Sequence, residues 1–111
     1  MPAAAQPYAT APVAQGGSRA LALSHARSEL DVGERELVVA GGDCRAACRA
    51  LGSMDRAAGH LCELANDGSE RSTCEDAKTT LLGARDRVRT TCGSCPGGAS
   101  VERTAPIPSV P

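Results

Sequence analysis

The fold is decided by residues 44–95, CRAACRALGSMDRAAGHLCELANDGSERSTCEDAKTTLLGARDRVRTTCGSC, which contain all six cysteines of the 111-residue chain. Cys44 and Cys62 are 18 residues apart, and so are Cys74 and Cys92. An α-helix has about 3.6 residues per turn, so 18 residues complete about five turns and return to the same face of the helix. The spacing therefore predicts an antiparallel helical hairpin whose two helices face each other through their cysteines.

The pairing of the cysteines follows only in part from this spacing. Cys62 and Cys74 flank the predicted turn and are expected to form a disulfide bond. Two arrangements stay open for the other four cysteines, since connectivity does not follow from sequence alone. An undistorted register gives Cys44–Cys92 with Cys48–Cys95 and needs a back-fold at Gly93. The nested arrangement gives Cys44–Cys95 with Cys48–Cys92 and shifts the two helices by about four residues, roughly one turn.

Composition indicates a small, disulfide-dependent domain. Phe and Trp are absent and Tyr8 is the only aromatic residue, so large apolar side chains are few. Small domains with so little core commonly depend on disulfides, which persist in oxidising compartments. Met1 begins no recognisable signal peptide, so we expect an export leader upstream and a location in the periplasm or cell envelope.

The charge and hydropathy of the chain argue against nucleic-acid binding and against a transmembrane segment. A formal net charge of −1 gives no basic surface for nucleic acid, whose binding depends on clustered positive charge. No apolar run of about 18 residues is present, so the sequence contains no transmembrane segment.

Three helices are expected between two disordered ends. Residues 1–17 resemble a flexible Ala/Pro-rich tether, and residues 96–111 a disordered Pro/Gly-rich tail. The cysteine-rich helical domain spans 18–95, with helices at about 18–40, 44–65 and 72–92. Asp43 is a good N-cap for the second helix. The segment 66–69 is a turn, and Ser72 with Glu75 fits a capping box for the third helix.

A heptad-like apolar stripe runs through the first two predicted helices, as in helices that pack on one another or form a coiled coil. The stripe is interrupted at two places: at Gly33, which lies on the stripe itself, and at Gly41 and Gly42. The pattern leaves open whether helix 18–40 extends the next helix or packs back on it. Because the stripe continues beyond the stapled hairpin, helix 18–40 is the expected arm for binding a protein partner or a second copy of the chain. The stripe consists of Leu23, Ala26, Leu30, Leu37, Ala40, Cys44, Ala47, Leu51, Met54, Ala58, Leu61 and Ala65.

The alternative chemistry for the cysteines is a metal site. Four thiolates from two closely spaced pairs can bind zinc or copper tetrahedrally, and such a protein would belong in the cytoplasm. The candidate ligands lie at the open end of the hairpin and are Cys44, Cys48, Cys92 and Cys95. Disulfides are favoured, because a metal site leaves the matched positions of Cys62 and Cys74 unexplained. Cys92 and Cys95 also form a C-x2-C motif, but they lie at the C-terminal end of the predicted helix, which disfavours the thiolate that redox chemistry needs.

No catalytic arrangement is recognisable, and we expect a non-enzymatic protein without a cofactor. His25 and His60 are expected to be solvated surface residues. Acidic residues cluster on helix 18–40, opposite the arginines of helix 72–92. Solvation or charge complementarity between helices explains them better than a catalytic pair. The acidic residues are Glu29, Asp31, Glu34 and Glu36, and the arginines are Arg85, Arg87 and Arg89.

The stretches DCRAACRALGSM (43–54) and LCELA (61–65), with the later cysteines, resemble a group of small cysteine-rich helical proteins of high-GC bacteria. The resemblance covers about residues 28–96 and implies no activity. Many of these proteins look like lipoproteins, with a leader, a Pro/Ala linker and a helical module. The sequence thus predicts an all-α, disulfide-stapled antiparallel hairpin with an additional N-terminal helix. The expected function is a structural or protein-interaction module of the bacterial cell envelope.

Overall fold

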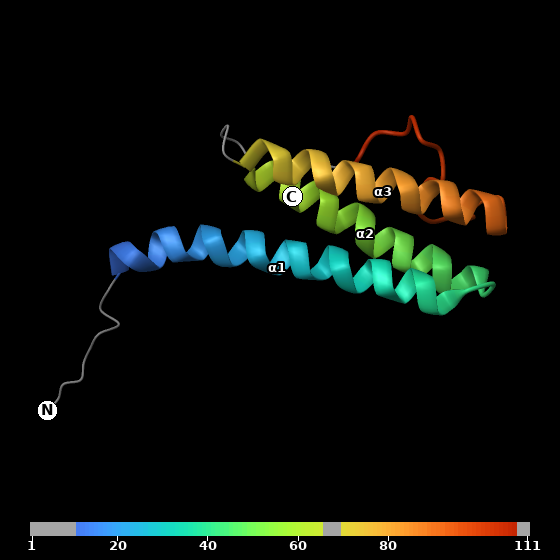
Figure 1. Cartoon of the computed structure of the whole chain (residues 1–111), viewed down its shortest axis with the longest axis horizontal. Helices are drawn as coiled ribbons and strands as arrows, with labels where there is room; N and C mark the ends of the chain where they lie inside the picture. The colour runs from blue at the N-terminus through green and yellow to red at the C-terminus, as the bar shows by residue number, and fades with distance from the viewer. Residues whose placement is uncertain (1–10, 66–69, 109–111) are drawn as a thin grey trace, which may run out of the picture.

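The computed structural model describes residues 11–65 and 70–108, and side chains from residue 18 onward. Its secondary structure is helical: α1 (Ala11–Ala40), α2 (Cys44–Leu64) and α3 (Arg71–Cys92). Successive helices run antiparallel to one another, with α2 between the other two (Figure 1). The predicted all-α hairpin with an N-terminal helix is therefore confirmed.

The first helix packs back on α2 and does not extend it. Gly41 adopts a positive φ of 55°, which a glycine accommodates without a Cβ clash. The turn is closed by Gly41 N donating to Val38 O at 3.3 Å and Asp43 N donating to Ala40 O at 2.8 Å. Asp43 then caps α2, as predicted, by accepting a hydrogen bond from Ala46 N at 3.1 Å. The collinear reading of the stripe is wrong, because folding back buries the apolar face of α1.

The apolar stripe of α1 forms one side of the core. Ala26, Leu30 and Leu37 are buried against α2, and Gly33 is buried among them. A Cβ added at Gly33 would lie 2.6 Å from Met54 Cγ, so the glycine is what lets α1 approach α2 closely at this level. Gly33 thus continues the stripe that it seemed to interrupt. Self-association through helix 18–40 stays a prediction, and it would have to use another face of α1 because α2 covers this stripe.

Two helix starts differ from expectation. α1 begins at Ala11, seven residues before the predicted start, and Pro12 falls in its first turn, where a missing N–H costs nothing. α3 begins at Arg71, and its N-cap position, Glu70, makes no side-chain capping bond. The predicted Ser72–Glu75 capping box is therefore absent. Residues 1–10 of the expected tether, the expected turn at 66–69 and residues 109–111 of the expected tail lie outside the described residues.

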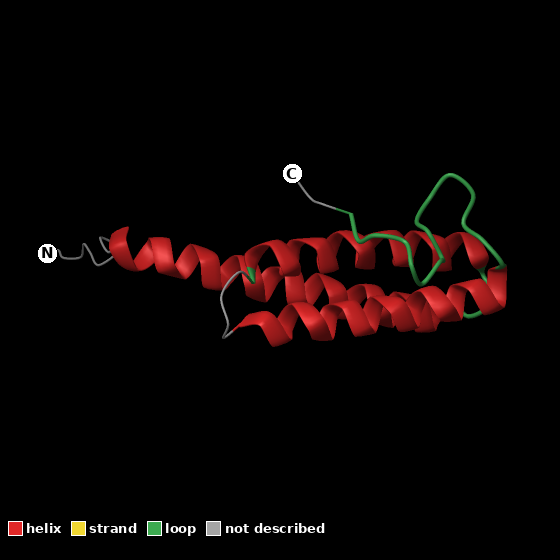
Figure 2. Ribbon diagram, turned by 90° about the horizontal axis from the view of Figure 1, so that it is seen from above, coloured by secondary structure: helices red, strands yellow, loops and turns green. Residues whose placement is uncertain are grey.

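The segment after the last helix is packed, although the sequence predicted disorder from residue 96 onward. Residues 96–108, called the C-terminal strap below, run back along α3 on the side away from α1 (Figures 1 and 2). Val101 is buried, and Ala99 and Ile107 pack against the core. These apolar contacts, with the hydrogen bonds described below, order a segment whose Pro/Gly content suggested a free tail.

Candidate functional site

Three disulfide bonds fix α2 to α3 and to the residues that follow it. Cα–Cα distances are 5.7 Å for Cys44–Cys92, 5.6 Å for Cys48–Cys95 and 4.5 Å for Cys62–Cys74. This is the undistorted register, not the nested one. The back-fold it needs is made at Gly93, whose φ of 84° lies in the left-handed region that glycine tolerates. Both ends of the hairpin are thereby held covalently.

The four cysteines of the alternative metal site all form disulfide bonds. Cys44, Cys48, Cys92 and Cys95 are all oxidised, and the described chain contains no free cysteine. No cluster of three or more His, Cys, Asp or Glu side chains that could hold a metal ion occurs within residues 11–65 and 70–108. Cys92 and Cys95 bond to different partners, so the C-x2-C motif is used to join α3 to two positions of α2.

The histidines and the acidic cluster are on the surface. His60 is exposed, and His25 Nε2 lies 3.3 Å from Glu29 Oε2 on the outside of α1. Asp31, Glu34 and Glu36 are exposed as well. The arginines of α3 bind elsewhere: Arg89 pairs with Asp86 on its own helix, while Arg85 is buried in the core. The expected surface position of both histidines is therefore confirmed.

A buried ion pair between Asp55 of α2 and Arg85 of α3 is the polar centre of the molecule. Arg85 is 1% exposed, and its Nη2 lies 3.3 Å from Asp55 Oδ1. Burial raises the pKa of Asp55 above its ordinary value of 3.8, and the Arg85 charge and hydrogen bond offset part of that rise. The two buried charges satisfy each other, and neither lines the grooves described below.

Arg85 also holds the C-terminal strap. Its Nη1 donates to the carbonyl oxygens of Glu102 at 3.1 Å and Ala105 at 2.7 Å, and its Nη2 donates to that of Pro106 at 3.2 Å. The Nε atom has no hydrogen-bond partner. A charged donor that reaches three carbonyls of one irregular segment fixes the path of that segment. The cluster is therefore structural: it joins α2, α3 and the strap.

Sequence reasoning missed this cluster, although a signal for it exists. Asp55 falls between Met54 and Ala58 of the apolar stripe, and Arg85 follows Ala84 on the buried apolar face of α3. Both are charged residues on buried faces. In the antiparallel hairpin their levels along the helix axes differ by only about one helical turn. A buried charge requires a partner, so the two positions could have been paired.

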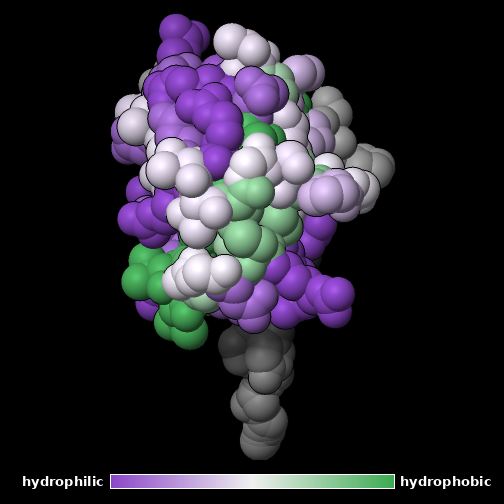
Figure 3. All heavy atoms as spheres, turned by 90° about the vertical axis from the view of Figure 1, so that its right-hand side faces the viewer, coloured by the Kyte–Doolittle hydropathy of each residue, from purple (hydrophilic) through white to green (hydrophobic). Residues whose placement is uncertain are grey.

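The solvent-facing side of α1 carries a second set of apolar residues. Leu21, Val32 and Val39 lie within about 20° of one another around the helix axis at 100° per residue. Val39 is 84% exposed, Val32 39%, and neighbouring Val38 62%. Figure 3 views the end of the molecule where α1 meets α2, and strongly hydrophobic side chains gather at its lower edge. Such exposed valines are typical of an interaction surface when they adjoin a groove.

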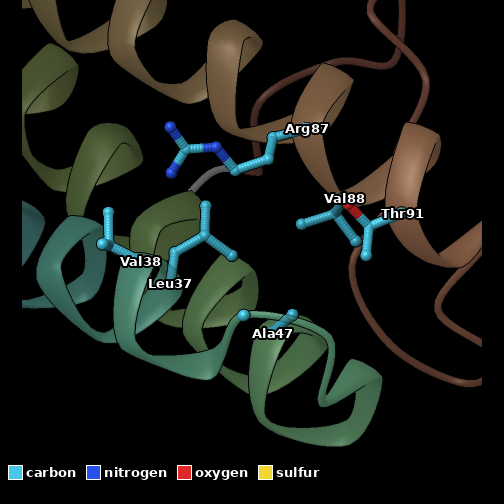
Figure 4. A pocket seen from close by; sticks show the side chains of 7 residues that line it. Leu37, Val38, Ala47, Arg87, Val88 and Thr91 are labelled. Atoms are coloured by element: carbon cyan, nitrogen blue, oxygen red, sulfur yellow. The ribbon is translucent and has the colours of Figure 1, made fainter.

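Two grooves flank α1. The α1–α3 groove, about 430 Å³, is lined by Leu37 and Val38 of α1, Ala47 of α2 and Arg87, Val88 and Thr91 of α3 (Figure 4). On the other side, the α1–α2 groove consists of two adjoining hollows of about 510 Å³ and 400 Å³ that share Val32 and Glu36. Its lining includes Arg35, Val39, Ala40, Ala46, Arg49 and Ala50 in one hollow and His25, Ser28, Glu29, Gly33, Ser53 and Arg56 in the other.

Three charged side chains that line the α1–α2 groove are unpaired, whereas Glu29 lies beside His25 and Arg56 donates a hydrogen bond to Ser53 Oγ. Among the described residues, Arg35, Glu36 and Arg49 form no ion pair and no side-chain hydrogen bond. Elsewhere on the surface, Arg19 pairs with Glu70 and Arg103 with Asp86. The α1–α2 groove therefore combines exposed valines with charges of both signs that have no intramolecular partner.

The chain matches no protein-family model, no curated protein and no solved structure. Within the described residues, no helix is long and apolar enough to cross a membrane.

Proposed function

We propose that this protein is a non-enzymatic protein-interaction module of the bacterial cell envelope, held rigid by its three disulfides. The observation that carries the proposal is the α1–α2 groove, where Val32 and Val39 are exposed beside unpaired charges. An apolar centre with a polar rim is the usual composition of a protein interface.

The scaffold supports this proposal because the disulfides fix α2, one side of the groove, while α1 is held on α2 by its buried apolar stripe. Near the end where the α1–α2 turn lies, one disulfide joins α2 to α3 and another joins α2 to Cys95, just after α3; the third closes the opposite end of the hairpin. A surface fixed before binding loses less conformational entropy on binding, so a small interface can suffice. The disulfides indicate an oxidising compartment. The assignment to the cell envelope rests in addition on the resemblance of residues 28–96 to lipoprotein-like proteins of high-GC bacteria.

The buried polar groups support an interaction role over an enzymatic one. Arg85 and Asp55 are the charged residues of the described core, and both are used to join helices and strap. A general acid or base must reach the reacting proton, within about 3 Å or through one water. Neither group borders the grooves described above.

The experiment that tests this function is site-specific photo-cross-linking in the cell envelope of the producing bacterium. A photoreactive residue replaces Val39 in the groove, and the control replaces Thr90, which is exposed on α3. The proposal predicts a discrete cross-linked protein species from position 39 and none from position 90. The absence of adducts at position 39, or recovery of the protein in the cytoplasmic fraction, would contradict it.

A further inference from the structure

The two rims of the α1–α2 groove carry opposite charges at the same spacing. On α1, Glu29 and Glu36 are seven residues apart; on α2, Arg49 and Arg56 are also seven residues apart. Seven residues correspond to about 10.5 Å along a helix axis. All four side chains are exposed and line the groove. These two pairs are called the acidic rim and the basic rim below; Arg35 and His25 of α1 line the same groove.

The two rims also lie at matching heights. α1 and α2 are antiparallel, and the contact between Gly33 and Met54 sets their register. Moving three residues on from Gly33 places Glu36 at the level of residue 51, about 3 Å along the axis from Arg49. Moving four residues back places Glu29 at the level of residue 58, again about 3 Å from Arg56. Each acidic residue therefore has an arginine across the groove at nearly its own level.

We propose that a second copy of this chain docks on the α1–α2 groove about a two-fold axis parallel to the helices. This rests on the proposed function and names its partner. Such an axis places α1 of each copy over α2 of the other, so that the acidic rim of each meets the basic rim of its partner. An interface of this kind is isologous, since the same residues occur on both sides.

The apolar centre of the groove fits the same arrangement. Val39 lies at the level of residue 48 of α2, between Ala46 and Ala50, whose small side chains line that hollow. In the dimer each exposed valine enters the space above these alanines in the partner. Burying Val39, now 84% exposed, removes the most exposed large apolar side chain of the described chain from water.

The interface is expected to be small. Two helices about 10 Å apart over about 25 Å present roughly 500 Å² per copy. The total is close to the ~1,000 Å² at which specific interfaces begin, so we expect a weak, reversible dimer. Because exposed ion pairs frame it, raising the salt concentration to about 1 M should weaken it several-fold.

Sedimentation equilibrium of the oxidised, purified chain between 1 and 500 µM tests the proposal. The unmodified protein should show a monomer–dimer equilibrium. Val39→Lys should raise the Kd at least tenfold, because it places a charge in the apolar centre. The matched control Val38→Lys changes a neighbouring exposed valine that faces the α1–α3 groove, and should leave the Kd within twofold.

A charge-reversal pair identifies the geometry. Glu36→Arg should weaken the dimer, because it opposes Arg49 of the partner, and Glu36→Arg combined with Arg49→Glu should restore it. Circular dichroism verifies that each variant is folded. A chain that stays monomeric at 500 µM in low salt, or a dimer unaffected by Val39→Lys, overturns self-docking. The function proposed above fails separately, since a cross-link from position 39 to a different protein would uphold it even if self-docking is overturned.

Discussion

Replacing Arg85 by Met removes the donor that joins α2, α3 and the C-terminal strap while keeping most of the side-chain volume. Asp55 loses its ion pair, and three strap carbonyls, those of Glu102, Ala105 and Pro106, lose their hydrogen-bond donor. Removing one partner of a buried pair typically costs about 3–5 kcal/mol, because the other charge is left buried. The carbonyls can reach water if the strap detaches, so we expect a loss near ~3 kcal/mol in the free energy of unfolding at pH 7.

Denaturant unfolding of the oxidised protein measures this loss, with Arg87→Met as control because Arg87 is exposed on the same helix. Limited trypsin digestion follows the strap separately, since Arg103 within it is exposed and becomes a faster cleavage site once the strap is released. The double variant Asp55→Leu/Arg85→Met removes both charges and should regain much of the stability. It should not regain trypsin resistance at Arg103. A change under about 0.5 kcal/mol in Arg85→Met, the scale of ordinary surface substitutions, with unchanged digestion would refute this role for Arg85.

The pH dependence of that loss has a definite sign. Burial raises the pKa of Asp55, so the folded protein binds a proton there more tightly than the unfolded chain. Stability from this group therefore increases as the pH falls from the raised pKa to about 3.8 and is lost as the pH rises. Without Arg85 the pKa rises further, because the two effects of Arg85 that lowered it are gone. The destabilisation by Arg85→Met should thus be larger at pH 8 than at pH 4.5; an equal loss at both would contradict the buried-pair account.

Three further predictions concern the scaffold. Gly33→Leu should destabilise the protein by about 1–3 kcal/mol, because its side chain must displace Met54; thermal unfolding compares it with exposed Gly83→Leu, where the added Cβ meets nothing within 4 Å. Asp43→Ala should cost about 0.5–2 kcal/mol by removing the cap of α2, whereas Asp43→Asn should cost little, as denaturant unfolding would reveal. Replacing Cys62 and Cys74 together by Ser should lower the free energy of unfolding by about 3 kcal/mol. Hydrogen exchange should show a larger loss of amide protection near residues 62 and 74 than at the opposite end of the hairpin, which the other two disulfides hold.

Much of the fold could be predicted because the cysteines and the apolar stripe obey the same helical period. The 18-residue spacing from Cys44 to Cys62 and from Cys74 to Cys92 reflects the register that the disulfides fix. The stripe residues Ala26, Leu30 and Leu37 are buried where the period of 3.5 places them. Local signals with one meaning, such as Asp43 before Cys44, were read correctly for the same reason.

The remaining features depend on contacts between distant residues, which a local pattern does not contain. The strap is ordered by Arg85 and by the burial of Val101, although its own composition resembles a free tail. The direction of α1 depends on Gly41 adopting a left-handed conformation, which the sequence permits but does not require. The α1–α2 groove appears only once α1 is folded back, so its charged rims were visible in sequence merely as an acidic cluster and scattered arginines.

The most direct test of a disulfide-rigidified module is the mass of the protein isolated from its native compartment, measured with and without reduction before thiol alkylation. Trypsin leaves Cys92 and Cys95 in one peptide, residues 90–103, so fragmentation at Gly93–Ser94 is needed to assign their partners. The account predicts no alkylation before reduction, six additions after it, and the pairs Cys44–Cys92, Cys48–Cys95 and Cys62–Cys74. Four thiols that react only after chelation of a metal would contradict it, as would the nested pairing.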